Sequence, residues 1–273
     1  MSLNPSNASS PRVVLVTGGT KGIGRGIAEG YLAAGDRVVV CARNAPVDLP
    51  QAGGRLAEFM ACDVREAEAV RGLVSQIVAR HGRLNVLVNN AGGSPMVDAA
   101  TVSPRFHEGV LRLNLFATLH ASQAANAQMQ LQSEGGVIVC IGSISGLRPS
   151  PGTAAYGAAK AAVLSLVSSL AVEWAPKVRV VAVSPGLVRT EQSQLHYGDE
   201  AGIAAVGATI PAGRMADPAD VAQACVWVSS AAASYMSGTN LLLHGGGEKP
   251  AFLAAAKGAA QAAPGTSKGS TGG

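Results

Sequence analysis

Short apolar runs alternate with longer amphipathic segments along most of the chain. The Val-Val-Val run at 38–40 and the Val-Ile-Val run at 137–139 contain no polar residue, a pattern typical of strands buried on both faces. Alternation of such strands with helices predicts an α/β fold with a parallel sheet between two helical layers. The predicted strands are 12–17, 37–42, 57–61, 84–89, 136–142, 178–184 and 239–243, and the predicted helices are 23–34, 65–81, 103–131, 154–175 and 218–231.

Two terminal segments and one internal segment lack this alternation. Residues 1–11 are polar and contain prolines, so we expect a flexible leader, and 248–273 form an Ala-, Gly- and Ser-rich tail. Residues 12–247 are predicted to form one domain. Within it, residues 187–213 fit no regular pattern, and a loop of this length usually has a function.

Composition argues against several classes of protein. The 273 residues are 48% hydrophobic and 14% charged, which is not the composition of a disordered chain. The net charge of +4 comes from scattered basic residues without aromatic platforms, so nucleic-acid binding is not expected. The four cysteines have no C-x-x-C spacing and the five histidines are dispersed, so we expect no metal. No secretory or membrane-spanning run is evident, which predicts a cytoplasmic location without membrane binding.

Tyr156 lies 13 positions after Ser143, and Lys160 follows Tyr156 by four positions. In a helix, positions i and i+4 share one face, so the phenol and the ammonium can enter the same cavity. A nearby positive charge favours the phenolate and lowers its pKa. Tyr156 is therefore predicted to be a general acid/base.

A glycine-rich turn follows the first predicted strand, in the sequence Thr-Gly-Gly-Thr-Lys-Gly-Ile-Gly at 17–24. Strand, glycine turn and helix in this order can bring backbone N–H groups close to a pyrophosphate. The alternative is a tight turn with a purely structural role.

Together these motifs resemble the short-chain dehydrogenase/reductase family, whose marks are T-G-x-x-x-G-x-G and Y-x-x-x-K. Asn89-Asn90-Ala91-Gly92 resembles the N-N-A-G of that family, and Pro185-Gly186 with Thr190 resembles its P-G-x-x-x-T. The resemblance covers about residues 12–247 and implies a doubly wound Rossmann-type sheet of about seven strands in the order 3-2-1-4-5-6-7. Ala117 and His244 depart from the glycine and aspartate that are common at these places in the family.

The resemblance also implies the cofactor site and the roles of its residues. Asp63 would accept from the adenine amino group, with Val64 on the ring, and Asn90 would either line the ribose side or only tie neighbouring strands. The implied cofactor-binding residues are Gly18, Thr20, Lys21, Gly22, Ile23, Gly24, Arg43, Asp63, Val64, Asn90, Ala91, Gly92, Tyr156, Lys160, Pro185, Gly186, Val188 and Thr190.

The residues after the second strand indicate which nicotinamide cofactor is used. NAD enzymes commonly place an acid there for the ribose 2′-OH, whereas this chain has Ala42 and Arg43. Arg43 and Lys21 would bind a 2′-phosphate, so NADP(H) is predicted over NAD(H). The alternative is that Arg43 is a solvated loop residue.

The catalytic set implied by the resemblance is Asn114, Ser143, Tyr156 and Lys160. Ser143 would hydrogen-bond the substrate oxygen, although Ser145 lies nearby, and Lys160 would lower the pKa of Tyr156 and bind the nicotinamide ribose. Asn114 would hold a water that links Lys160 to solvent, or would only cap or kink its own helix.

The predicted function is NADP(H)-dependent interconversion of a ketone and a secondary alcohol. The alternatives are an NAD-dependent alcohol dehydrogenase of the same family and a catalytically silent nucleotide-binding sensor or scaffold. Segment 187–213 would close over the substrate, and a homotetramer, or else a dimer, is implied. Apolar positions in that segment, Ile203, Ala204 and Val206, suggest an apolar carbonyl such as a 3-oxoacyl thioester or a steroid. The substrate-facing residues would be Ser143, Ser145, Gly93, Ser94, Met96 and Leu187.

Overall fold

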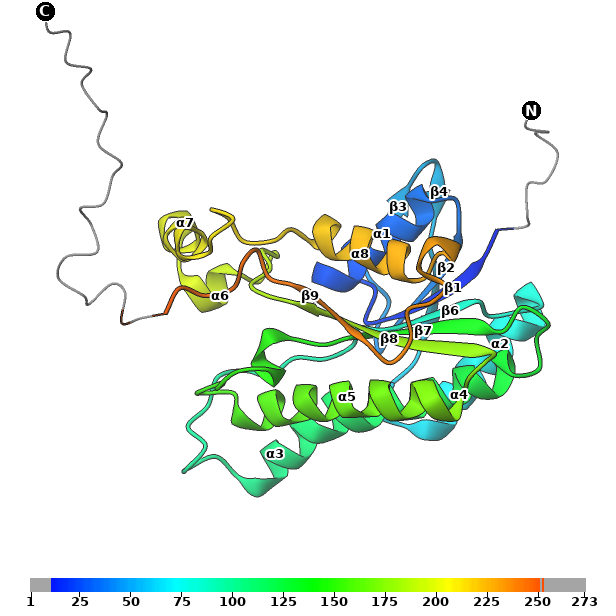
Figure 1. Ribbon diagram of the computed structural model, residues 1–273, viewed down its shortest axis with the longest axis horizontal. Coiled ribbons are helices and arrows are strands. Elements are labelled where there is room, and N and C mark those ends of the chain that lie inside the picture. The colour runs from blue at the N-terminus through cyan, green and yellow to red at the C-terminus, as the bar shows by residue number, and fades with distance from the viewer. Residues whose placement is uncertain (1–10, 251, 253–273) are drawn as a thin grey trace, which may run out of the picture.

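The computed structural model describes residues 11–250 and Phe252. The expected leader (1–11) and most of the expected tail (248–273) therefore lie outside the described residues. Between them the chain forms an α/β fold in three layers (Figure 1).

The central sheet contains seven parallel strands in the order β5-β2-β1-β6-β7-β8-β9, which confirms the predicted order. Neighbouring strands pair in register, for example Val14 with Val38 across β1 and β2, and Leu15 with Leu87 across β1 and β6. The strands, in their order along the chain, are β1 (Val13–Thr17), β2 (Arg37–Ala42), β5 (Glu58–Ala61), β6 (Val86–Asn89), β7 (Gly136–Ile141), β8 (Val178–Pro185) and β9 (Asn240–Leu243).

Helices cover both faces of this sheet, as Figure 1 shows. On one face lie α1 (Gly22–Ala33) and α8 (Pro218–Val228), and on the other α2 (Ala67–His81), α4 (Ala117–Met129) and α5 (Ala154–Glu173). Successive residues of a strand point to opposite faces and enter the two core clusters in turn. This double burial is why the strand sequences show no alternation with polar residues.

The structure differs from the sequence prediction in three places. The predicted helix 103–131 is divided into α3 (Pro104–Leu111), a π-helical turn (Arg112–Phe116) and α4. The predicted irregular segment 187–213 contains α6 (Gln194–Tyr197) and α7 (Glu200–Thr209), the latter capped by the Asp199 carboxylate, which accepts from Gly202 N at 3.0 Å. A small hairpin of β3 (Gln51–Ala52) and β4 (Arg55–Leu56) was not predicted.

The break between α3 and α4 lies at Asn114. Its Nδ2 donates to Val110 O at 2.9 Å, and Thr118 Oγ1 donates to Asn114 O at 3.2 Å. Polar side chains that donate to the carbonyl one turn back compete with the hydrogen bonds of the helix itself. Such competition is consistent with the locally wider, π-helical turn at this position. The continuous helical pattern in the sequence did not reveal this break.

Two general findings bear on the classes of function. One helix of the described part, α5, is long and apolar enough to cross a bilayer, yet Val163, Val167 and Leu170 pack it into the core beneath the sheet. Within residues 11–250 and Phe252, no group of three or more His, Cys, Asp or Glu side chains could hold a metal ion.

Candidate active site

A cleft of about 880 Å³ runs along the carboxyl ends of the central strands. This is the edge at which doubly wound sheets bind their ligands, because the strand order reverses there and the loops diverge. Of the residues predicted to bind cofactor or substrate, all line the cleft except Thr20. Asn114 lies behind it, and Ile203, Ala204 and Val206 do not line it.

The glycine turn brings the backbone unusually close to its neighbours. Gly18 and Gly22 have φ of 62° and 53°, and α1 begins at Gly22 without a side-chain cap from Lys21. The first N–H groups of α1 are thus left for another acceptor. A Cβ on Gly24 would lie 2.3 Å from Gly18 O, so only glycine fits there. A cradle of free N–H groups at a helix start fits a pyrophosphate.

Asn90 fixes this turn against the end of β6. Its Nδ2 donates to Thr17 O at 3.0 Å and to Gly18 O at 3.1 Å, and its backbone N donates to Thr17 Oγ1 at 3.0 Å. Asn90 therefore ties the glycine turn to the end of β6, the structural role that one of the two alternatives gave it. Because Asn90 also lines the cleft, a contact with the cofactor stays a prediction.

Basic side chains surround one carboxylate at the end of the cleft near β2 and β5. Arg43 and Lys21 are exposed and line the cleft. Arg65, which the sequence analysis missed, pairs with Asp63 through Nη2–Oδ2 at 2.5 Å and Nε–Oδ1 at 2.9 Å. These hydrogen bonds, with a smaller effect from the Arg43 charge, lower the pKa of Asp63 to about 2. The Glu191 carboxylate also lines the cleft, beside Gly22, so three cations and two carboxylates give this end of the cleft a small positive excess.

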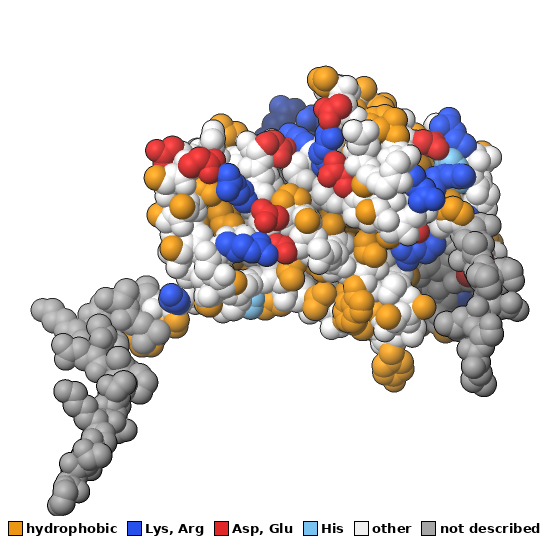
Figure 2. All heavy atoms as spheres, turned by 90° about the horizontal axis from the view of Figure 1, so that it is seen from above, with side chains coloured by type: hydrophobic (Ala, Val, Ile, Leu, Met, Phe, Trp, Pro, Cys, Tyr) orange, Lys and Arg blue, Asp and Glu red, His pale blue; other side chains and the backbone are white. Residues whose placement is uncertain are grey.

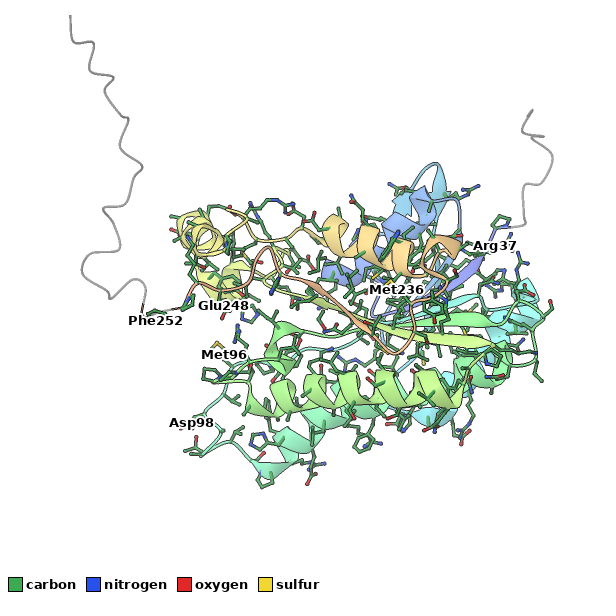
Figure 3. The ribbon with its side chains drawn as sticks, viewed as in Figure 1. Arg37, Met96, Asp98, Met236, Glu248 and Phe252 are labelled. Atoms are coloured by element: carbon green, nitrogen blue, oxygen red, sulfur yellow. The ribbon has the colours of Figure 1, made fainter. Side chains whose placement is uncertain are left out.

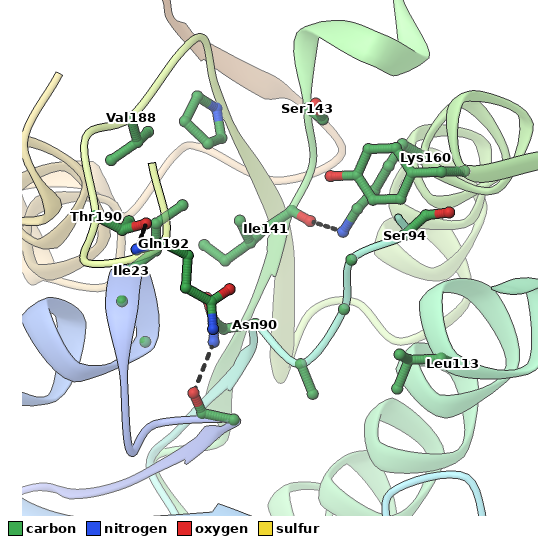
Figure 4. A pocket seen from close by; sticks show the side chains of 18 of the residues that line it. Ile23, Asn90, Ser94, Leu113, Ile141, Ser143, Lys160, Val188, Thr190 and Gln192 are labelled. Atoms are coloured by element: carbon green, nitrogen blue, oxygen red, sulfur yellow. Dashed lines mark hydrogen bonds between the residues drawn. The ribbon is translucent and has the colours of Figure 1, made fainter. Parts of the chain in front are cut away.

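The three reactive side chains meet at the carboxyl end of β7. Ser143 follows that strand and caps a 3₁₀ turn (Ile144–Gly146), its Oγ accepting from Ser145 N at 3.1 Å. Tyr156 and Lys160 come from the first two turns of α5. Lys160 Nζ donates to Ile141 O at 2.8 Å and lies 5.6 Å from the centroid of the Tyr156 ring (Figure 4).

The pKa values of this group differ from the sequence expectation. Burial raises the pKa of Tyr156, and only the hydrogen bond with Ser143 opposes it. The lowering of the Tyr156 pKa that was expected from Lys160 is not among these effects, and the Lys160 ammonium donates to Ile141 O instead. Burial lowers the pKa of Lys160 to about 8.

Asn114 is fully buried, and its side-chain amide hydrogen-bonds backbone groups of the cleft wall. Its Oδ1 accepts from Gly93 N at 2.8 Å, and its Nδ2 donates to Gly93 O at 3.0 Å. A Cβ on Gly92 would lie 2.6 Å from Asn114 Oδ1 and 3.5 Å from Lys160 Nζ. Asn114 thereby fixes the cleft wall beside Lys160, and its link to a water stays a prediction.

The remaining wall of the cleft combines polar side chains with apolar ones such as Leu113 and Pro151, and most of it was missed from the sequence. Ser150 and Thr153 share a hydrogen bond at 2.7 Å, and Arg148 is the charged residue between Ser143 and Tyr156. Gln192, His196 and Tyr197 come from the segment that was predicted to be irregular. The lone charge within an otherwise uncharged stretch was the available signal for Arg148. No comparable pattern marked α6.

Comparisons with known proteins agree with this geometry. A family model described as enoyl-(acyl carrier protein) reductase matches residues 18–248. An uncharacterized short-chain type dehydrogenase/reductase from Sinorhizobium fredii is 35% identical over 246 residues, which span 86% of this chain but 43% of that longer protein. L-fucose dehydrogenase from Oryctolagus cuniculus is 36% identical over 254 residues, covering 87% of this chain and 85% of that enzyme.

Solved structures resemble the fold closely. Thermoplasma acidophilum aldohexose dehydrogenase aligns with a TM-score of 0.80 at 31% identity, covering 86% of this chain and 93% of that one. ElxO with NADP bound aligns with a TM-score of 0.78 at 28% identity, over 87% and 98% of the two chains.

The lowered pKa of Lys160 predicts a pH dependence of stability. Between a folded pKa of about 8 and the ordinary 10.5, the unfolded chain binds this proton more tightly, so folded-state stability rises with pH. Lys160→Met removes this titration. From pH 7 to pH 10 the free energy of unfolding of the wild type should therefore rise by about 2 kcal/mol relative to the variant.

Urea unfolding of the wild type and of the variant at both pH values measures this difference. The contributions of all other titrating groups cancel, because both proteins contain them. Lys177→Met, which removes a lysine from the surface, is the control and should show no such change. A wild-type-minus-K160M difference that is flat with pH would contradict the assignment.

Proposed function

The chain belongs to the short-chain dehydrogenase/reductase family, and we propose that it is an NADP(H)-dependent enzyme that interconverts a ketone and a secondary alcohol. Oxidoreduction of alcohols or ketones with a nicotinamide cofactor is the activity of this family. One observation carries the proposal: Ser143, Tyr156 and Lys160 line the same cleft as the glycine turn and its basic residues.

The residues of the chain divide the work of binding and proton transfer. The bound cofactor supplies or accepts the hydride. Tyr156 exchanges the proton with the substrate oxygen, and Ser143, which lines the same cleft, donates to that oxygen where negative charge develops. Burial raises the pKa of Tyr156, so the phenol carries its proton at neutral pH and is available as the donor in carbonyl reduction.

Lys160 is suited to resupply protons. A group with a pKa of about 8 loses and regains its proton readily near neutral pH. Its ammonium is held at Ile141 O, beside the wall that Asn114 fixes through Gly93. We assign Lys160 and the Asn114 region to the path by which the proton used by Tyr156 is replaced.

The preference for NADP(H) rests on the positive end of the cleft. Arg43 and Lys21 lie there as exposed cations, and the Asp63 carboxylate is paired with Arg65. A 2′-phosphate would meet cations, whereas the acid that NAD enzymes commonly use for the 2′-OH is not at the end of β2. The glycine turn and the free N–H groups of α1 would hold the pyrophosphate.

The polar side chains on the substrate side of the cleft favour a hydrophilic substrate over an apolar one. Ile203 packs with Ile210 and Met215 in a separate cluster, with Val206 against it, so the residues that suggested an apolar ligand serve the fold of α7. Ser145, Ser150, Thr153 and Gln192 line the cleft instead. Two relatives are named for sugars, L-fucose and aldohexose, and a polyhydroxylated carbonyl or alcohol suits the same kind of wall.

Closure and assembly complete the proposal. We assign the closing movement over the substrate to residues 187–213, which include α6 and α7. We further propose that residues 12–247 form a single domain and that the enzyme is cytoplasmic. The outer face of α5 carries small exposed residues, Ala158, Ala161 and Ser165, and the exposed Val172, which permit close helix packing. This face suits the contact of a homotetramer, which sedimentation analysis can measure.

The surface does not favour nucleic acid as a partner. On the face in Figure 2, blue and red side chains lie beside one another, and many arginines are paired, such as Arg25 with Asp48 at 2.7 Å. Pairing of this kind leaves little positive field for a phosphate backbone.

Removal of the Tyr156 hydroxyl should abolish the proton step. Tyr156→Phe is expected to lower kcat with NADPH by about 100-fold or more, since general acid catalysis contributes at least that much. NADPH binding, followed by fluorescence titration, should change little. Tyr235→Phe, at a fully exposed tyrosine, is the control. Turnover retained in Y156F would overturn the mechanism.

Reversal of charge at Arg43 should change the cofactor preference. Arg43→Asp is expected to lower kcat/KM for NADPH relative to NADH by about tenfold or more, because charge-assisted hydrogen bonds to the 2′-phosphate are lost. Arg105→Asp makes the same charge change at an exposed position of α3 away from the cleft and should leave the ratio unchanged. An unaltered ratio in R43D would refute the preference.

A further inference from the structure

Arg148 occupies the substrate side of the cleft with its hydrogen-bonding capacity only partly used. It lies in the loop between Ser143 and Tyr156 and lines the same cleft as both. Nη1 donates to Pro149 O at 2.8 Å, and Nη2 donates to Glu248 Oε1 at 2.6 Å. Nε is buried and has no hydrogen-bond partner. A buried unpaired N–H is costly, so native proteins rarely leave one without a reason.

The partner of Arg148 comes from far along the chain. Glu248 lies 100 residues later, directly after three glycines (Gly245–Gly247) that all have positive φ. Its side chain is 47% exposed, against 35% for Arg148. In Figure 3, Glu248 and the exposed Met96 lie at the same end of the molecule, the end that carries α6 and α7 in Figure 1. A carboxylate on such a glycine hinge can leave without disturbing the core.

The geometry of the pair resembles half of a bidentate contact. A carboxylate that binds an arginine side-on accepts from Nε and one Nη together, which gives two parallel hydrogen bonds. The Glu248 carboxylate takes Nη2 alone. Arg148 also acts on the segment above it, since its charge opposes the burial that raises the pKa of Tyr197. Tyr197 belongs to α6, within the proposed closing segment.

From these observations we propose that Arg148 binds a carboxylate of the substrate, and that Glu248 occupies this place until the substrate displaces it. The proposal names the substrate class of the function given above and rests on it: a hydroxy or oxo acid whose reacting carbon lies at Ser143 and Tyr156. Its carboxylate would bind Arg148, and its hydroxyl groups would bind Ser150, Thr153 and Gln192. Arg148 is thus a specificity-determining residue.

The test compares two ligands that share a six-carbon polyol chain and differ in charge. D-gluconate carries a carboxylate and D-glucitol does not. Isothermal titration calorimetry of the wild type should show gluconate binding about tenfold or more tightly than glucitol, as a charge-assisted contact implies. Arg148→Gln should bring the two Kd values to within about twofold of each other, and Arg148→Lys, which keeps charge without the fork, should fall between.

The chain offers a matched control pair. Arg80 of α2 and Glu58 of β5 form an ion pair at 2.9 Å, with side chains 60% and 34% exposed, and neither residue lines the cleft. Arg80→Gln should keep the preference for gluconate. Glu248→Gln should tighten gluconate binding a few-fold by removing the competitor, whereas Glu58→Gln should not.

The outcomes separate this inference from the proposed function. If the wild type binds gluconate no better than glucitol, or if R148Q and R80Q keep the same preference, the inference is overturned. If Glu248 merely ties down the chain, E248Q will lower the melting temperature without changing the gluconate Kd, which also contradicts it. Calorimetry needs no turnover, so a failure to reduce any ketone with NADPH would count against the proposed function alone.

Discussion

The site depends on one charged group that the fold places out of water. Lys160 is only 4% exposed and meets the carbonyl of Ile141 at the end of β7. Burial of an ammonium is unfavourable, and the pKa of about 8 expresses that cost. Because Tyr156 lies one helical turn away on the same face, the contact that anchors Lys160 also holds the phenol beside Ser143. The cavity, the proton chemistry and the seating of α5 all depend on this contact.

Electrostatics divide the cleft into regions with different tasks. The glycine turn, Lys21, Arg43 and Arg65 make one end suited to phosphate groups, with Asp63 neutralised by its arginine. At the other side, the single cation Arg148 faces hydroxyl groups and an exchangeable carboxylate, Glu248. The buried lysine lies between these regions. In the proposed function, charged ligand groups would bind at the two ends of the cleft, which would leave the reacting carbon near Tyr156.

Backbone geometry supplies the rigidity on which these side chains rely. Asn90 joins the glycine turn to β6, and Asn114 clamps Gly93 from behind the wall. Both amides hydrogen-bond backbone groups, so each fixes a loop that would otherwise be free to move. The π-helical turn at Asn114 belongs to the same arrangement, because it brings that amide towards Gly92 and Lys160.

The sequence by itself determined the strands and most of the helices, whereas the strand order and most of the cleft lining came from the family resemblance of its motifs. Local rules suffice for the buried β-branched runs, the glycine turn and the i, i+4 pair, since each specifies its own geometry. It also marked Ser143, Tyr156 and Lys160 correctly as neighbours. It could not give the pKa of Tyr156, because burial and the direction of the Lys160 ammonium depend on how α5 seats against β7.

The tertiary structure alone decided the character of the substrate side. Ile203 and Val206 looked like ligand contacts in sequence, but they pack around Met215, and the cleft receives Gln192 and Tyr197 instead. Two ion pairs, Asp63–Arg65 and Arg148–Glu248, show what the sequence analysis missed at short and at long range along the chain. The first spans two residues and was overlooked, whereas the second joins positions a hundred residues apart, which only the folded chain brings into contact. Long-range contacts of this kind leave no periodic trace in a sequence, because each partner is an isolated residue in a loop.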